Sequence, residues 1–199
     1  MSKLLAVGTL AYDAIETPFD RTEKTLGGSV SYIALAASHF NIDVGIVSVI
    51  GGDFEEKYLD LLRSKNIDLG GVEQVKEGKT FFWAGRYHND MNSRDTLVTE
   101  LNTLADFDPK VPENFKDAEV LLLGNLHPSI QLSVLDQMQK RPNVVILDTM
   151  NYWIEHTPEE LESVLKRIDV LAINDEEARQ LSGQYSLVKA AKKILQKGP

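Results

Sequence analysis

Two adjacent glycines, Gly27 and Gly28, stand just before a segment with the apolar spacing of a helix, and Asp13 follows an earlier apolar run. Glycine lacks a Cβ, so backbone N–H groups here can approach a ligand closely, and a helix start adds unpaired donors and a positive dipole end. A carboxylate accepts two hydroxyl hydrogen bonds and so recognises a vicinal diol. These residues predict a site for a small polyhydroxylated ligand. The alternative is a flexible loop ahead of a helix, with Asp13 solvated.

Polar side chains also follow predicted strands further along the chain. Asp148 and Asn151 come at the end of one apolar run, where ligands bind in open α/β sheets, although a turn-forming aspartate is the alternative. Asn174 and Glu177 have the spacing of a capping box at a helix start. Asn125 follows another strand and could line the same pocket from the opposite wall.

The elements that must position these residues are short apolar runs, which alternate with longer segments of helical spacing. This order is typical of an α/β protein with a doubly wound, mainly parallel sheet flanked by helices, and continuous apolar runs indicate strands covered on both faces. The predicted strands are residues 4–8, 44–49, 120–123, 144–147 and 170–173. The predicted helices are residues 29–40, 54–64, 130–139, 159–167, 176–181 and 187–195. Asp53 and Glu56 have the spacing of a cap for the second of these helices.

One region breaks this order, because residues 80–87 and 95–99 alternate in the manner of two strands joined by a polar turn. They predict a small β-hairpin that can serve as a lid, with Trp83 on the same face as Tyr87 and Phe82 on the other. Because both faces of the hairpin carry apolar side chains, each face must pack against another surface. We expect one to be the ligand pocket and the other the hairpin of a second copy in a homodimer; the alternative is a sheet edge packed within one monomer.

The composition is that of a globular protein: 199 residues, of which 43% are hydrophobic and 26% are charged. A formal net charge of −9 and a pI near 4.9 argue against nucleic acid or an anionic membrane surface as a partner. The chain has no cysteine, which excludes disulfides, thiolate catalysis and Cys-based zinc sites. The first residues lack the organisation of a signal peptide, so we expect a cytoplasmic protein.

Six short motifs occur in a characteristic order along the chain. They are Val7-Gly8 with Asp13, Gly27-Gly28 through Ala34, Ile50-Gly51-Gly52-Asp53-Phe54, Asn66-Ile67-Asp68, Leu147-Asp148-Thr149-Met150-Asn151 and Asn174-Asp175-Glu176-Glu177. Their order and spacing together resemble those of the ribokinase-like sugar kinases, the PfkB family, across the whole chain. Asn66 stands where the family has glycine, and asparagine is the residue that best replaces glycine at a left-handed helix end.

The resemblance implies a ribokinase-like fold and an ATP-dependent phosphotransferase that acts on a hydroxyl of a sugar or a sugar-containing molecule such as a nucleoside. ATP and Mg²⁺ are the implied cofactors. The residues expected to hold the acceptor are Asp13, Gly27, Gly28, Tyr32, Trp83 and Asn125. The residues expected near the phosphates are Asp148, Asn151, Asn174 and Glu177, with Glu177 acting on magnesium through water. Positioning and electrostatics provide most of the acceleration in such a transfer.

Two further departures from the family pattern bear on the function. Tyr32 stands where the family has an asparagine that binds the substrate; tyrosine could stack on a sugar or base, or fill core space. The family's Gly-Ala-Gly-Asp segment, which carries the anion hole and the catalytic base, has no counterpart, so no catalytic residue is assigned. We expect residues 1–199 to be the N-terminal part of one domain, with lid strands around 12–26 and 80–100 and the nucleotide-binding part absent. The alternative function is a catalytically silent sensor of sugar or nucleoside.

Overall fold

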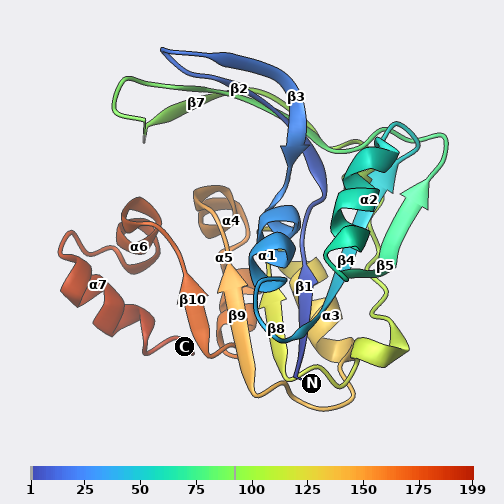
Figure 1. The fold of residues 1–199 in the computed structure, drawn as a ribbon. Coiled ribbons are helices and arrows are strands. Elements are labelled where there is room, and N and C mark those ends of the chain that lie inside the picture. Colours follow the sequence, from blue (N-terminus) through green and yellow to red (C-terminus); the bar gives the residue numbers. More distant parts are fainter. Residues whose placement is uncertain (1, 92) are drawn as a thin grey trace.

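The main body of the protein is a six-stranded sheet in which every neighbouring pair of strands is parallel (Figure 1). The computed structural model describes residues 2–91 and 93–199. The strand order is β10-β9-β8-β1-β4-β5. The bounds are β1 (Lys3–Val7), β4 (Asp43–Gly51), β5 (Asp68–Val75), β8 (Val120–Leu123), β9 (Val144–Asp148) and β10 (Val170–Ala172). The predicted α/β class and parallel sheet are therefore confirmed.

Helices cover both faces of this sheet. They are α1 (Ser29–Ala37), α2 (Glu56–Ser64), α3 (Pro128–Gln137), α4 (Asn151–His156), α5 (Pro158–Leu165), α6 (Asp175–Ser182) and α7 (Leu187–Ile194), with two 3-10 turns at Asn102–Asp106 and Glu113–Phe115. Among the described residues, no helix has both the length and the apolar character needed to cross a membrane.

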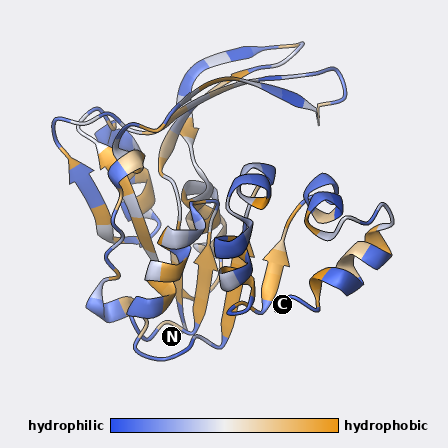
Figure 2. Cartoon of the chain, turned by 180° about the vertical axis from the view of Figure 1, so that it is seen from behind, coloured by the Kyte–Doolittle hydropathy of each residue, from blue (hydrophilic) through white to orange (hydrophobic). Residues whose placement is uncertain are grey.

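Two buried clusters explain why the strands are apolar along their whole length. Leu5 and Val7 of β1 pack on one face with α3 and α5, whereas Ala6 packs on the other face with α1 and α2. Successive side chains of a strand point to opposite faces, so both sets must be apolar. Figure 2 shows the resulting hydrophobic strands in the main sheet. At the edge strand β10 the cover is incomplete, and Val170 is 44% exposed.

A second sheet of four strands, which we call the small sheet, arches over the carboxyl ends of the main strands (Figure 1). Its order is β3-β2-β6-β7. The bounds are β2 (Ala11–Glu16), β3 (Arg21–Gly27), β6 (Phe82–Tyr87) and β7 (Arg94–Glu100). The predicted hairpin is present as β6 and β7, and β6 joins the earlier hairpin of β2 and β3 by parallel pairing. The small sheet is thus assembled from two hairpins far apart in the sequence.

Two local expectations at α2 had different outcomes. Asn66, just after the helix, has φ 57°, which confirms the left-handed helix end. The predicted cap at Asp53 is wrong: the N-cap residue is Glu55, and no side chain caps the helix. The Asp53 carboxylate instead accepts hydrogen bonds from Thr80, which is 27 positions away. A cap is predicted from local spacing, whereas this contact exists only once the chain has folded.

Candidate functional site

Asp13 and the glycine pair lie together where the small sheet meets α1. A Cβ added to Gly27 would lie 2.2 Å from the Asp13 carboxyl group, so only glycine leaves room for this side chain. Gly28, the N-cap residue of α1, has φ 88°, and its Cβ would lie 2.1 Å from the Thr9 carbonyl oxygen. Burial raises the pKa of Asp13 above its usual value, and the nearby backbone N–H of Gly28 opposes this shift. The structure therefore forms a half-buried carboxylate beside glycine backbone.

The start of α1 rests directly on the ends of two main strands. Glycine follows each strand, Gly8 after β1 and Gly124 after β8, and a Cβ at these positions would lie 2.5 Å and 2.6 Å from the Ser29 hydroxyl oxygen. Ser29 in turn donates its N–H to the Thr9 hydroxyl at 3.2 Å. The missing side chains let the first turn of α1 approach the carboxyl edge of the sheet, where open α/β proteins bind ligands.

Aromatic side chains surround Asp13 on the same side of the small sheet. Trp83 is paired with Asp13 in the β2–β6 register, so their side chains share a face. Tyr32 of α1 is 59% exposed and donates its hydroxyl to the Leu26 carbonyl at 3.3 Å. Burial raises the pKa of Tyr32, and the nearby groups of Asp13 and Tyr87 raise it further. Tyr32 therefore lies near the carboxylate and is not part of the main core.

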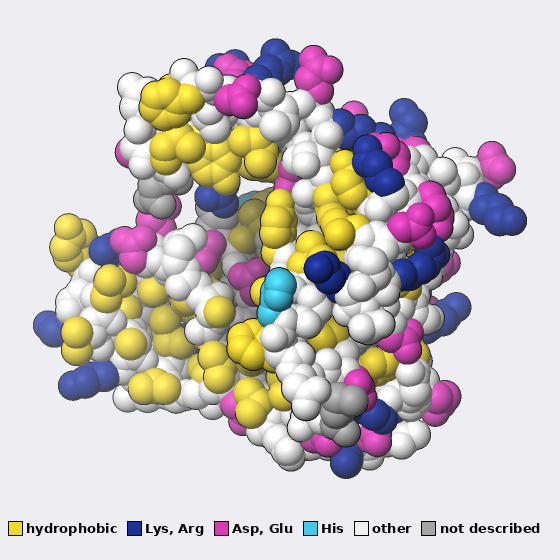
Figure 3. Space-filling view, viewed as in Figure 1, with side chains coloured by type: hydrophobic (Ala, Val, Ile, Leu, Met, Phe, Trp, Pro, Cys, Tyr) yellow, Lys and Arg dark blue, Asp and Glu magenta, His cyan; other side chains and the backbone are white. Residues whose placement is uncertain are grey.

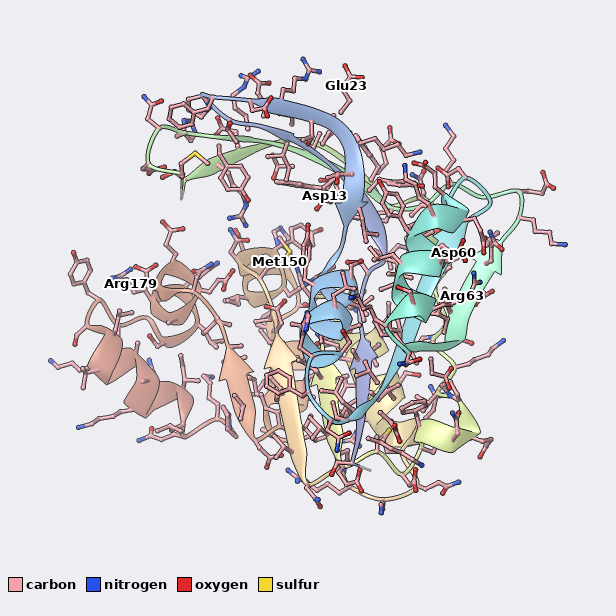
Figure 4. All side chains as sticks on the ribbon, in the orientation of Figure 1. Asp13, Glu23, Asp60, Arg63, Met150 and Arg179 are labelled. Carbon is pink, nitrogen blue, oxygen red and sulfur yellow. The ribbon has the colours of Figure 1, made fainter. Side chains whose placement is uncertain are left out.

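A hollow separates the small sheet from the helical body (Figure 3). Apolar side chains line the underside of the small sheet in this view. Asp13 is at the root of the small sheet, and Met150, the N-cap residue of α4, lies across the hollow from it (Figure 4). Asp13, with Gly27 against its carboxyl group, therefore lies on the small-sheet side of the hollow.

The predicted residue Asn125 faces α4 and is engaged by protein groups at both ends of its amide. Its Oδ1 accepts a hydrogen bond from Trp153 Nε1 at 2.8 Å, and its Nδ2 donates to the Met150 sulfur at 3.1 Å. Asn125 therefore orients Trp153 in this structure.

Trp153 belongs to a row of four rings that sequence reasoning missed. Trp153 contacts His127 with ring centroids 5.0 Å apart and Tyr152 at 4.9 Å, and Tyr152 stacks on His156 at 4.2 Å. We call these four residues the aromatic row. The sequence shows three of these rings within residues 152–156, but this segment lies between the predicted strand 144–147 and the predicted helix 159–167 and belongs to neither.

Two carboxylates lie near each other at the ends of β9 and β10. Burial is the main cause that raises the pKa of Asp148 to about 6, and the charge of Glu177 adds to it; the N–H groups of Asn125 and Thr149 oppose the shift. Glu177 and Asn174 form the predicted capping box, with both hydrogen bonds at 2.9 Å. The capping prediction is therefore confirmed.

The remaining predicted phosphate residue, Asn151, is the first residue of α4 and is exposed. Its Oδ1 accepts a hydrogen bond from the Tyr152 N–H at 3.0 Å. Within residues 2–91 and 93–199, no three His, Cys, Asp or Glu side chains are grouped to hold a metal ion. Asp148 and Glu177 can therefore attract a cation, but the described side chains supply no complete coordination shell for one.

Comparison with known proteins identifies the family. Residues 1–199 match the family model described as pfkB family carbohydrate kinase, and the chain belongs to this family. A cytidine kinase from Thermococcus kodakarensis is 28% identical over 193 residues, which cover 96% of this chain and 68% of that relative.

Solved structures show the same fold. The structure of Burkholderia thailandensis nucleoside kinase in complex with inosine has a TM-score of 0.79 and 16% sequence identity, and the match covers 98% of this chain and 67% of that one. The fructokinase of Halothermothrix orenii has a TM-score of 0.76 and 19% identity, with 98% and 76% of the two chains covered. The ribokinase-like fold expected from the motifs is therefore confirmed.

Proposed function

We propose that the chain takes part in ATP-dependent phosphoryl transfer to a hydroxyl group of a sugar-containing small molecule, and that a nucleoside is the preferred acceptor. The observation that carries this proposal is the Asp13 carboxylate held against Gly27 and Gly28 at the start of α1. Membership of the PfkB family supports the kinase class. Asp13 accepts hydrogen bonds from two hydroxyls of the acceptor, while the glycines let the sugar ring lie close to the backbone.

The nucleoside preference is supported by aromatic groups on both sides of the hollow. Trp83 and Tyr32 lie on the side of Asp13, and the aromatic row lies at α4. Planar bases stack on aromatic rings, and a bare sugar uses such surface less well. The similarity to the cytidine kinase of Thermococcus kodakarensis and to the nucleoside kinase solved with inosine supports this preference.

ATP and Mg²⁺ are the cofactors that the family implies, and the residues at β9 and β10 fit them. The negative charge of Glu177 repels the ionised carboxylate of Asp148 and so raises its pKa. A divalent cation with its water shell would relieve this repulsion. Asn151 and Asn174 place polar groups at the same edge of the sheet. When bound, Mg²⁺ supplies positive charge to the phosphates; the role of Glu177 is to hold its waters.

A calorimetric titration of this chain with ribose, fructose, cytidine and inosine tests the proposal. We expect cytidine or inosine to bind more tightly than either sugar. Asp13→Ala should weaken that binding roughly 100-fold, because hydrogen bonds to a charged group are lost. Asp20→Ala, which alters an exposed carboxylate at the β2–β3 turn, is the matched control and should bind as the unaltered chain does.

Two results would contradict this function. Affinity that is unchanged in Asp13→Ala removes Asp13 from the site, and an absence of binding to all four compounds removes the acceptor proposal. A sensor without catalytic activity would bind the same compounds. ADP formation with ATP, Mg²⁺ and the bound compound would favour a kinase, whereas its absence would not separate the two, because this chain has no counterpart of the Gly-Ala-Gly-Asp segment.

A further inference from the structure

Buried polar contacts hold the two central strands of the small sheet at the point where they leave the main body. β2 and β6 start side by side, since Tyr12 pairs with Phe82 and the Tyr12 N–H donates to the Phe81 carbonyl at 2.9 Å. Thr80, just before β6, is 1% exposed. Its N–H and its hydroxyl both donate to Oδ1 of Asp53, each at 2.7 Å. One carboxylate oxygen therefore accepts both hydrogen-bond donors of the residue that leads into β6.

Asp53 is also connected to β2, through its backbone. The Tyr12 hydroxyl donates to the Asp53 carbonyl at 3.2 Å and accepts from the Glu55 N–H at 2.7 Å. The Tyr12 ring packs on Phe54 with centroids 5.3 Å apart, and burial raises the pKa of its hydroxyl, which remains a donor at neutral pH. We call Tyr12, Asp53 and Thr80 the root clamp.

The loop that carries Thr80 packs closely against the end of β4. The Gly51 N–H donates to the Thr80 hydroxyl oxygen at 3.0 Å. A Cβ at Gly51 would lie 2.4 Å from the Lys79 carbonyl carbon, and one at Gly52 would lie 2.0 Å from the Lys76 carbonyl oxygen. The loop backbone therefore lies directly on these two glycines, and the Thr80 side chain completes the contact.

The residues next to the clamp are those of the candidate acceptor site. Asp13 directly follows Tyr12 and pairs with Trp83, three residues after Thr80. We propose that the root clamp positions Asp13, with Asp53 as a positioning residue that acts through Thr80 and Tyr12. For acceptor binding this inference rests on the proposed function. Asp53, which the local spacing predicted to be a helix cap, thus has a role in positioning Asp13.

Amide hydrogen exchange tests the clamp without any ligand. We expect Asp53→Ala and Thr80→Val to speed exchange in β2 and β6 about tenfold or more, since each removes hydrogen bonds to a carboxylate, and to leave β1 and β8 unchanged. Asp53→Asn and Thr80→Ser keep an acceptor or a donor in place and should restore slow exchange. Tyr12→Phe, which keeps the ring, should give a smaller increase in the same strands.

Asp68→Ala is the matched control. Asp68 also accepts a backbone N–H, from Gly70 at 2.7 Å, and a side-chain amide, from Asn114 at 2.9 Å, but it lies at the start of β5. It should leave β2 and β6 unaffected. Two results would overturn the inference. Equal acceleration of exchange in β1, β8, β2 and β6 after Asp53→Ala would show a general effect on stability. Unchanged exchange in both Asp53→Ala and Thr80→Val would show that no clamp exists.

A cytidine titration adds the functional readout. We expect Asp53→Ala to weaken cytidine binding roughly tenfold and Asp53→Asn to bind nearly as the unaltered chain does. Equal affinity of all three forms overturns the positioning of Asp13 even if exchange responds. If the unaltered chain binds inosine and not cytidine, the same comparison is made with inosine. If it binds neither nucleoside, the proposed nucleoside acceptor fails, whereas the exchange comparison still decides whether the clamp holds the small sheet.

Discussion

Asp13 and Asp148 are half-buried carboxylates whose pKa values are raised chiefly by burial, and their second partners differ. Asp13 lies near the backbone N–H of Gly28, which favours its charged form. At Asp148 the charge of Glu177 opposes the charged form, and its influence is larger than that of either the Asn125 or the Thr149 N–H, which favour that form. The first arrangement suits a hydrogen-bond acceptor for hydroxyls, and the second suits a cation. Similar burial thus gives the two ends of the candidate site different chemistry.

The pH dependence of unfolding tests the Asp148 environment. Its pKa is about 6 in the folded chain against a reference of 3.8, so between these values the folded chain keeps a proton that the unfolded chain loses. Stability therefore falls as pH rises through this window and stays reduced above it. Asp148→Asn should be the more stable form at neutral pH, by about 1 kcal/mol after solvent screening, and this advantage should vanish below the reference value.

Urea unfolding at a series of pH values makes this measurement. Asp169→Asn is a control of opposite sign, because Arg141 and the Val145 N–H hold the pKa of Asp169 below its usual value. It should lose stability at neutral pH and recover relative to the unaltered chain in acid. A stability difference for Asp148→Asn that does not change with pH would contradict the raised pKa.

At the scale of elements, the start of α1 shows what a glycine can provide. Gly28 has a positive φ and lies against the Thr9 backbone, whereas Gly183 at the end of α6 has φ 65° and an open surrounding, with the nearest atom, Lys193 Nζ, at 4.0 Å. Both positions strain an L side chain, but only Gly28 also lacks space for one. The two glycines therefore separate conformational strain from steric overlap.

Gly28→Ala and Gly183→Ala form a matched pair for this comparison. Gly183→Ala should lower the free energy of unfolding by about 1 kcal/mol, the strain of a left-handed backbone. Gly28→Ala should lower it by about 3 kcal/mol or more, because the added Cβ overlaps a carbonyl oxygen that the fold cannot easily move. Urea denaturation measures both losses, and equal losses would contradict the close contact between α1 and Thr9.

Elements with a continuous apolar run or a clear alternation were predictable from the sequence, and elements that lack both were not. The runs 120–123 and 144–147 match β8 and β9 within one residue, because both faces are covered and every position is apolar. β5 is an edge strand with Gly70, Gly71 and several polar residues, so no apolar run marks it. The six-residue helix α4 is too short to show periodicity. Burial creates the sequence pattern, and these elements have little of it.

The candidate site shows the same division. Asp13, Gly27 and Gly28 could be selected because each residue type has a chemical reason to stand at a strand end or a helix start. The contact of Asp53 with Thr80 could not, since it joins residues 27 positions apart. The ring contact of His127 with Trp153 depends in the same way on how α4 packs beside the β8–α3 loop. Roles that follow from local geometry are visible in a sequence, whereas roles that follow from tertiary contact are not.

On the scale of the whole molecule, the small sheet is attached to a well-packed body but has little core of its own. Every residue of β7 is exposed, and this edge strand has Leu97 47% exposed and Val98 40% exposed. An exposed apolar edge with unpaired backbone groups favours pairing with another strand. The homodimer through the small sheet therefore stays a prediction of this structure.

Sedimentation velocity tests the dimer. We expect a concentration-dependent monomer–dimer equilibrium, and Val98→Lys should shift it to monomer, because a charge on an edge strand opposes pairing. Val188→Lys is the control: Val188 is also exposed, at 67%, but lies on α7. It should leave the equilibrium unchanged. A monomer at every concentration, or an equal effect of both variants, would contradict association through β7.

The parallel pairing of β2 with β6 has a consequence for the order of events during synthesis. The bond between Glu16 and Arg86, which links the two strands, joins residues 70 positions apart. On the ribosome the hairpin of β2 and β3 emerges long before β6, and β4, α2 and β5 are translated in between. The edge of β2 that later pairs with β6 therefore stays unpaired until Tyr87 has been synthesised. During this interval, chaperone binding or premature association would affect this hairpin first.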